Sequence, residues 1–289
     1  MAKELKAGVS ISDNVIQVVV LEFHSDGITV RHLNEFQNNG RENSWFINAV
    51  LRAREEISAK ITNVSVVLDY NNVFLLSFPL DTSLTQPEQN EQVQWELSNY
   101  IEDYKPREYI SDIHILRTRA RDQVSEVLAV NVKRDLLFTI QHKLADEHID
   151  LHLADIHHFG AQHVLLTSYP ELRAKTVVLA GISKNRIDAG ILTDGRLKTY
   201  RYGFVSSAEE CTIFLQDLTK DISFSEMFVY GTGTPGETVK SLQERFSVNV
   251  SLLNPFRKLM ISPSFRDFGN FAGQEHHFAS CVGCALRTN

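Results

Sequence analysis

The chain repeats one order of predicted elements: three apolar strands joined by two tight turns, followed by a helix. In the first copy the strands are residues 7–11, 15–23 and 28–33, the turns 12–14 and 25–27, and the helix 44–57. In the second copy the strands are residues 176–182, 186–192 and 196–202, the turns 183–185 and 193–195, and the helix starts near 207. Val- and Ile-rich runs between such turns are typical of antiparallel strands. The repeat predicts a duplicated α/β lobe, with two unrelated α/β segments as the alternative.

Each half continues with elements that can complete a sheet covered by helices. Further strands are expected at residues 64–68, 127–132, 227–230 and 248–252, and a helix at 135–145. These runs are short and apolar, which suits strands buried between helices. We therefore expect a first lobe at residues 1–168 and a second lobe at residues 169–289.

Residues 79–125 do not fit the repeat and are interpreted as a subdomain inserted into the first lobe. A helix there carries an apolar stripe made by Val93, Leu97, Tyr100, Ile101 and Tyr104. For Trp95, Tyr100 and Tyr104 we favour packing against the sheet of this subdomain. Contact with a protein partner is the alternative, because aromatic residues are frequent in binding hot spots.

Composition excludes several classes of protein. A net charge of −7 without a basic cluster argues against nucleic-acid binding, which needs concentrated Lys and Arg. No apolar run reaches the length of a membrane-spanning helix, and the first residues lack the apolar core of a secretory signal. Three cysteines, an odd number, do not indicate a disulfide framework. A cytoplasmic protein is expected.

Six segments, each weak alone, resemble one known family in the same order. They are GVSISDNVIQVVVLE (8–22), WELSNYI (95–101), LADIHHFGAQHVLL (153–166), GRLKTYR (195–201), LLNPF (252–256) and VGCALR (282–287). The family is that of the type IV pilus assembly protein PilM, itself similar to the cell-division protein FtsA. The resemblance implies an actin-like α/β fold: duplicated RNase H-like lobes, mixed five-stranded sheets flanked by helices, and a small subdomain inserted in the first lobe.

The resemblance also shows where this chain departs from ATP-binding relatives. Actin-like proteins hold Mg-ATP with an Asp-x-Gly hairpin in each lobe and a glycine-containing adenosine loop. Here the hairpins read Ser10-Ile11-Ser12 and Gly181-Ile182-Ser183, and only Gly231 and Gly233 of the adenosine loop remain. The second lobe's base-clamping subdomain is reduced or absent, since residues 203–227 leave room for one helix. Ser10, Ser12, Ser183, Gly231 and Gly233 are thus expected to be vestigial nucleotide loops, without bound ATP or Mg²⁺.

Two clusters contain possible metal ligands. Cys281 and Cys284 follow His276 and His277 with a spacing that could hold zinc, but their segment is apolar, and a buried helix is favoured. Six histidines lie between residues 142 and 163: His142, His148, His152, His157, His158 and His163. The alternation around residues 149–153 suits a strand, and a solvated or slightly pH-sensitive surface is favoured over a metal site.

No nucleophile motif is present, and Asp188 and Asp194 have no evident catalytic partner in the sequence. The leading hypothesis is a non-catalytic cytoplasmic scaffold of a PilM-like pilus or secretion platform. By resemblance, it would bind the cytoplasmic tail of a bitopic inner-membrane protein between the first lobe and its inserted subdomain. Self-association is a further possibility, and membrane contact would be through the partner alone. The alternatives are a Mg-ATP-binding ATPase or phosphotransferase and, more weakly, a metal-binding protein.

Overall fold

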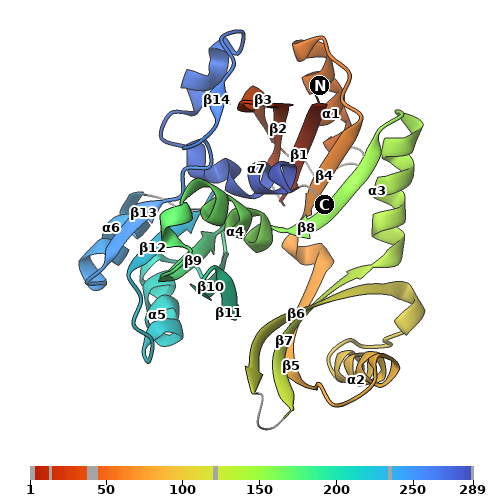
Figure 1. Cartoon of the computed structure of the whole chain (residues 1–289), viewed down its shortest axis with the longest axis vertical. Coiled ribbons are helices and arrows are strands. Elements are labelled where there is room, and N and C mark those ends of the chain that lie inside the picture. Colours follow the sequence, from red (N-terminus) through yellow and green to blue (C-terminus); the bar gives the residue numbers. More distant parts are fainter. Residues whose placement is uncertain (1–3, 13–14, 38–44, 120–122, 234–235, 288–289) are drawn as a thin grey trace.

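This computed structural model describes residues 4–12, 15–37, 45–119, 123–233 and 236–287. Its first sheet begins with the expected three-stranded meander (Figure 1). Its strands are β1 (Glu4–Ile11), β2 (Val15–His24), β3 (Gly27–Gln37), β4 (Asn63–Leu68) and β8 (Asp150–Ile156). β1, β2 and β3 are antiparallel, whereas β4 and β8 continue the sheet in parallel. Helices α1 (Trp45–Ile57) and α3 (Arg134–Asp146) pack on it through a core around Val18, Val50 and Leu144. The predicted turn residues Asp13 and Asn14 and helix residue Ser44 lie outside the described residues.

The second sheet repeats this topology. Its strands are β9 (Thr176–Ile182), β10 (Arg186–Thr193), β11 (Arg196–Phe204), β12 (Glu226–Tyr230) and β13 (Asn249–Leu252), in the order β11-β10-β9-β12-β13. The first sheet contains the matching order β3-β2-β1-β4-β8. Asp194 and Gly195 both have positive φ, as the tight hairpin turn predicted from Asp-Gly requires. The duplicated lobe is confirmed.

One helix, α5 (Ala208–Thr219), fills the chain between β11 and β12 in the second lobe, so no helical subdomain stands there. α6 (Gly236–Arg245) connects β12 to β13, and α4 (His157–Ser168) joins the two lobes. Short 3-10 helices are η1 (Tyr70–Asn72), η2 (Pro106–Glu108), η3 (Pro170–Leu172), η4 (Arg266–Phe271) and η5 (Glu275–Phe278). Within the described residues, no helix has the length and apolar character needed to cross a bilayer.

The inserted subdomain is a three-stranded antiparallel sheet with one covering helix. Its strands β5 (Val73–Asp81), β7 (Val124–Lys133) and β6 (Tyr109–Arg119) carry α2 (Gln86–Ser98) on one face. Residues 127–132, expected as a strand of the first-lobe sheet, therefore belong to this subdomain, a difference from the sequence prediction. The cause is strand pairing: β7 lies between β5 and β6, and both β5 and β7 extend beyond the expected range of 79–125.

The C-terminal segment returns to the first lobe, whereas the sequence-based boundary assigned all residues after 169 to the second. β14 (Met260–Ile261) pairs with β3 as a sixth strand, and α7 (Ala279–Leu286) packs between β1 and α4. Close packing explains this position: a Cβ on Gly283 would lie 1.8 Å from the carbonyl oxygen of Gly160, and one on Gly8 would lie 2.0 Å from that of Cys281. Only glycine permits such approach.

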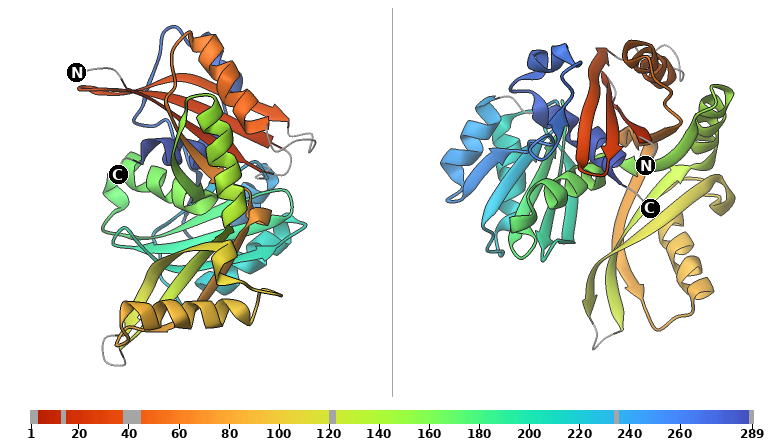
Figure 2. Two further views of the ribbon diagram at one scale, coloured as in Figure 1. Left: turned by 90° about the vertical axis from the view of Figure 1, so that its right-hand side faces the viewer. Right: turned by 45° about the horizontal axis from the view of Figure 1, so that its top comes forward.

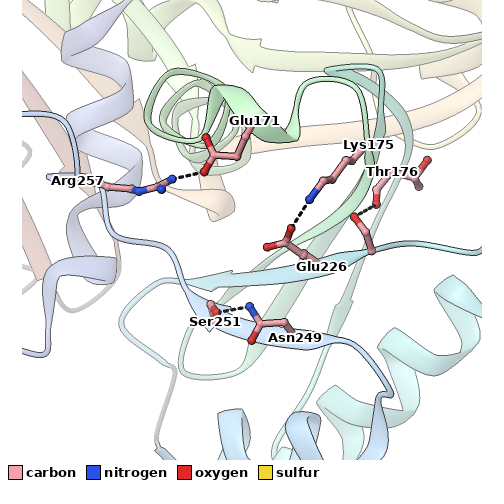
Figure 3. Close-up of polar contacts among 8 residues, drawn as sticks. Glu171, Lys175, Thr176, Glu226, Asn249, Ser251 and Arg257 are labelled. Carbon is pink, nitrogen blue, oxygen red and sulfur yellow. Dashed lines mark hydrogen bonds and ion pairs between the residues drawn. The ribbon is translucent and has the colours of Figure 1, made fainter.

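Polar contacts close the edge of the second sheet at the start of β9 and β12 (Figure 3). Lys175 pairs with Glu226 at 2.9 Å, and Arg257 pairs with Glu171 at 2.5 Å. These side chains are exposed to solvent, so each pair contributes little to the stability of the fold. The opposite edge, at the carboxyl ends of the same strands, faces the first lobe and forms the candidate site.

Candidate functional site

A cavity of about 300 Å³ lies between the two lobes, at the carboxyl ends of β1, β9 and β12. Ser10, Ser12, Ser183 and Gly231 all line it, so the fold brings together four of the five residues expected in the vestigial nucleotide loops. The fifth, Gly233, is not among the residues that line the cavity. Its N–H donates a 2.9 Å hydrogen bond to the carbonyl oxygen of Ile182.

Two of the three serines bond to the backbone of their own hairpins, and the third lies beside α4. The hydroxyl of Ser12 donates to the carbonyl oxygen of Val15 at 3.0 Å, and that of Ser183 donates to the carbonyl oxygen of Arg186 at 3.2 Å. The Ser10 hydroxyl lies 3.5 Å from Nδ1 of His157. Side-chain bonds within a hairpin stabilise its turn, so Ser12 and Ser183 act on the backbone that carries them.

The two glycines of the adenosine loop have a packing role of their own. Gly231 has φ of +102°, and a Cβ there would lie 2.4 Å from the carbonyl oxygen of Ile182. A Cβ on Gly233 would lie 2.2 Å from backbone atoms of Ser183. The close approach of this loop to the end of β9 therefore requires both glycines, whether or not a nucleotide binds.

The centre of the interlobe contact is Asp188, which is 1% exposed. Oδ1 accepts a 2.5 Å hydrogen bond from the hydroxyl of Tyr70, and Oδ2 accepts bonds from the hydroxyl of Tyr230 at 2.9 Å and Nδ1 of His158 at 3.0 Å. Burial opposes ionisation, but the bonds from His158 and Tyr70 and the charge of Arg186 prevail and hold the pKa of Asp188 below its usual range.

The ring of Tyr230 occupies the space where the second Asp-x-Gly hairpin would have its acidic side chain. A Cβ on Gly181 would lie 2.4 Å from the Tyr230 ring and hydroxyl and 2.7 Å from Oδ1 of Asp188. Glycine at position 181 thus makes room for the Tyr230–Asp188 bond. The Tyr230 ring and its bond to Asp188, both within the second lobe, thus stand where that carboxylate would lie.

A stack of planar groups adjoins this network. The guanidinium of Arg186 lies 4.2 Å from the ring centroids of both Tyr70 and Tyr202, and Tyr70 also stacks on His157 at 4.6 Å. Nε2 of His157 lies 3.2 Å from the carbonyl oxygen of Ile11, so a neutral imidazole protonated on Nε2 fits the site. Burial lowers the pKa of His157 to about 4, in agreement with that neutral form.

The sequence analysis missed Tyr70, Asp188, Arg186 and Tyr230 as a group. One signal was available: Asp188 is a carboxylate inside an apolar strand, and buried carboxylates are almost always paired. The interpretation of the histidines as a solvated surface is wrong for His158, which is fully buried, because α4 turns that side chain into the core between the lobes.

The carboxylates in and beside the cavity accept hydrogen bonds from the chain itself. The carboxylate of Asp69, which lines the cavity, caps η1 by accepting from the N–H of Asn71, and both oxygens of Asp188 are engaged as described above. Across the described residues, no group of three or more His, Cys, Asp or Glu side chains could hold a metal ion. Cys281 and Cys284 are fully buried in α7, as a helix packed in the core requires.

A second concave feature, here called the tail groove, has a volume of about 120 Å³. It runs between the inserted sheet and β8, the last strand of the first sheet. Ile110, Val130, Leu137, Leu153 and Phe159 give it an apolar lining. At one end, Arg287 pairs with the buried carboxylate of Asp155. Burial raises the pKa of Asp155, and the charge of Arg287 opposes that rise.

The three aromatic residues suggested for partner contact differ in exposure. Trp95 is 62% exposed and Tyr100 is 63% exposed, so the favoured interpretation of core packing is wrong for both. Val93 and Leu97 are the residues of α2 that face the sheet, and a helical residue two positions away points to the opposite side. Tyr104 is half-buried and lies 5.2 Å from the ring of Tyr109.

Comparison with solved structures shows an actin-like fold. A chain of the PilM–PilN type IV pilus biogenesis complex matches with a TM-score of 0.80 and 15% identity over 98% of both chains. A Bacteroides thetaiotaomicron protein with an actin-like ATPase fold and unknown function matches with a TM-score of 0.58 and 14% identity, covering 87% of this chain and 91% of that one. The ethanolamine utilization protein EutJ of Carboxydothermus hydrogenoformans matches at 0.52 and 10% identity over 99% and 90%. No family model and no curated protein matches the sequence.

Proposed function

We propose that this chain is a non-catalytic scaffold of a pilus- or secretion-type assembly, located in the cytoplasm, that binds the cytoplasmic tail of an inner-membrane protein. The observation that carries the proposal is the tail groove between the inserted sheet and β8. Support for the type of assembly comes from the match along 98% of the chain to the PilM–PilN type IV pilus biogenesis complex.

The tail groove suits an extended apolar peptide for two reasons. β8 ends its sheet among the described strands, so its outer edge offers backbone groups with which an added strand can pair. Apolar side chains from the inserted sheet, α3 and β8 converge beside that edge, which gives alternate side chains of a peptide places to insert.

The absence of catalysis is proposed from the cavity between the lobes. The hydroxyls of Ser12 and Ser183 stabilise hairpins, and the glycines of the adenosine loop serve packing. Tyr230, bonded to Asp188, occupies the position of a hairpin carboxylate. The hydrogen bonds of Tyr70, His158 and Tyr230 to Asp188 link the lobes beside this cavity, so a Mg-nucleotide that moved the lobes apart would break them. Breaking such a network costs several kcal/mol, which a weakly held ligand does not return.

The experiment is a calorimetric titration of the purified chain with synthetic peptides. The peptides correspond to the cytoplasmic tails of bitopic membrane proteins encoded near its gene, with scrambled versions of the same composition as controls. Binding of one tail and not of its scrambled version is expected. If every tail behaves like its scrambled control, the proposed function is wrong.

A further inference from the structure

A buried arginine lines the cavity between the lobes, and part of its hydrogen-bonding capacity is unused. Arg186 is only 9% exposed and lines the cavity of about 300 Å³, here called the interlobe cavity. Within the described residues, its Nε has no hydrogen-bond partner. Asp188, the nearby carboxylate, does not line the cavity and accepts its hydrogen bonds from three other side chains. Because buried charged groups are normally paired or hydrogen-bonded, this guanidinium indicates a site for a ligand.

The rings that flank Arg186 leave the edge of its guanidinium as the part that a ligand can approach. The ring centroids of Tyr70 and Tyr202 each lie 4.2 Å from its Cζ, so both faces are covered. The N–H donors of a guanidinium lie in its plane and point outward from that edge. Two neighbouring N–H groups match the two oxygens of a carboxylate, and such charged pairs are stronger than neutral hydrogen bonds. The geometry therefore suits a carboxylate in the plane of the guanidinium.

The charges that face the interlobe cavity favour one additional negative charge. Its described lining contains two cations, Arg186 and Lys184, and one carboxylate, Asp69. Burial lowers the pKa of His157 to about 4, and burial also lowers the pKa of His277, so both imidazoles are neutral near pH 7. A ligand with a single carboxylate balances this lining, whereas a chain of phosphates would bring several negative charges close to Asp69.

An exposed aromatic side chain stands where the interlobe cavity opens to solvent. Phe204, at the end of β11, lines the cavity and is 77% exposed. Lys184 and Asn185, in the turn between β9 and β10, line it as well and are also exposed. The ring of Phe204 can stack on a flat apolar group, which adds to binding. Ligand pockets run from roughly 300 to 1,000 Å³, so a cavity at the lower end of that range suits a small molecule.

Both lobes contribute to the walls of the interlobe cavity. α4 and α7 lie between the two large sheets, and His157 of α4 and Ser280 of α7 both line the cavity (Figure 2). Ser10 comes from β1 of the first lobe, whereas Arg186 and Phe204 come from the second. A ligand held by Arg186 therefore lies between the lobes and contacts both.

We propose that the interlobe cavity binds a small organic acid, with its carboxylate on the edge of the Arg186 guanidinium and a flat apolar body against Phe204. The anchor of this site is a side chain of β10. The hydroxyls of Ser12 and Ser183, in contrast, are directed to the backbone of their own hairpins. The inference is independent of the proposed function, since the tail groove lies between the inserted sheet and β8.

Calorimetric titration with 3-phenylpropionate tests the site, and its neutral amide serves as the matched probe. The acid is expected to bind with a dissociation constant on the order of 1 mM or below, as a molecule of this size allows. The amide should bind at least roughly tenfold more weakly, because it lacks the charge that pairs with Arg186. Inorganic phosphate should also bind more weakly than the acid, since it has no apolar body to cover Phe204.

Three variants locate the acid. Arg186→Lys keeps the charge but loses the planar donors, and should weaken binding of 3-phenylpropionate at least roughly tenfold. Because Arg186 is buried, Phe204→Ser provides a second variant at an exposed position, where the fold tolerates the change, and should weaken binding about fivefold or more. Ile213→Ser is the matched control, since Ile213 is 57% exposed on α5, outside the cavity, and should bind the acid like the wild type.

Three results would overturn the proposal. The first is a wild-type chain that does not bind the acid, or binds it no better than the amide. The second is phosphate that binds as tightly as the acid, and the third is a Phe204→Ser chain with the affinity of the control. Peptide titration at the tail groove decides the proposed function separately.

Discussion

The hydroxyl of Tyr70 donates a 2.5 Å hydrogen bond to Oδ1 of Asp188, across 118 residues of sequence and from one lobe to the other. Tyr70 lies in η1, just after β4 of the first sheet, and Asp188 lies in β10 of the second. Burial, followed by the charge of Asp188, raises the pKa of Tyr70 well above its usual value. The phenol therefore stays protonated and remains a donor across the physiological pH range.

Replacing Tyr70 with Phe should destabilise the chain by about 1 to 2 kcal/mol, because a buried carboxylate oxygen loses a donor while the ring remains stacked. Urea unfolding at neutral pH measures the change. Tyr109→Phe is the control: Tyr109 is half-buried within the inserted subdomain, and the same chemical change there should alter stability by no more than about 0.5 kcal/mol. Equal effects of the two substitutions would show that the lobes are not joined through this bond.

Millimolar Mg-ATP should leave the unfolding midpoint of the chain unchanged to within about 1 °C, since a ligand raises the midpoint only when it binds the folded state. Restoring acidic residues to both hairpins with Ser10→Asp and Gly181→Asp should not create binding. A side chain at position 181 would collide with Tyr230 and Asp188. A thermal-shift titration of the wild type and the double variant decides the matter, and a rise of several degrees in the wild type would restore the ATPase hypothesis.

Ile110→Glu should weaken binding of the membrane-protein tail by at least roughly tenfold, or about 1.4 kcal/mol. Ile110 lines the tail groove on β6 and is 36% exposed, so a charge there is tolerated by the fold yet opposes an apolar peptide. Ile213→Glu is the matched control, since Ile213 is 57% exposed on α5, outside the groove. Calorimetric titration gives the affinities, and an unchanged affinity for Ile110→Glu would place the peptide elsewhere.

The stability of the chain should fall as pH decreases from about 6.5 toward 4. Burial lowers the pKa of His157 to about 4 from an ordinary value of 6.5. In that interval the unfolded chain binds a proton that the folded chain does not, so the stabilisation is complete above pH 6.5 and is lost on acidification, to a limit of roughly 3 kcal/mol. His157→Gln should reduce this dependence, whereas His142→Gln, on the exposed side of α3, should not. Urea unfolding at several pH values measures the slopes, and identical slopes for wild type and His157→Gln would contradict the assignment.

The repeated meander could be predicted because its determinants are local. Apolar runs of strand length end at Asx and Gly turns, and the positive φ angles of Asp194 and Gly195 follow from that turn chemistry alone. The pairing partners of each strand could not be predicted in the same way. Residues 127–132 form a strand as expected, but pairing with β5 and β6 depends on contacts distant in sequence, which an apolar pattern does not specify.

The candidate site could be located from sequence but not described. Ser10, Ser12, Ser183 and Gly231 lie beside one cavity, because the duplicated topology fixes where the loops meet. The side chains at the interlobe contact are paired across long stretches of sequence, as Tyr70 is with Asp188, and a local sequence pattern does not specify such pairs. The exposure of Trp95 was predictable in principle, since it lies two residues from both Val93 and Leu97 and so on the opposite side of α2.

Gly283→Ala tests the packing that brings α7 back to the first lobe. The new methyl group would lie 1.8 Å from the carbonyl oxygen of Gly160 on α4, so the two helices must separate. Overpacking of a dense core costs about 1 to 3 kcal/mol, and a backbone collision with no flexible side chain to yield should reach or exceed the upper end. Gly236→Ala is the matched control, because its Cβ would meet no atom within 4 Å at the start of α6. That control should be neutral or stabilising by roughly 0.5 to 1 kcal/mol. Comparable unfolding midpoints for the two variants would mean that α7 is not held against α4 as closely as the glycines require.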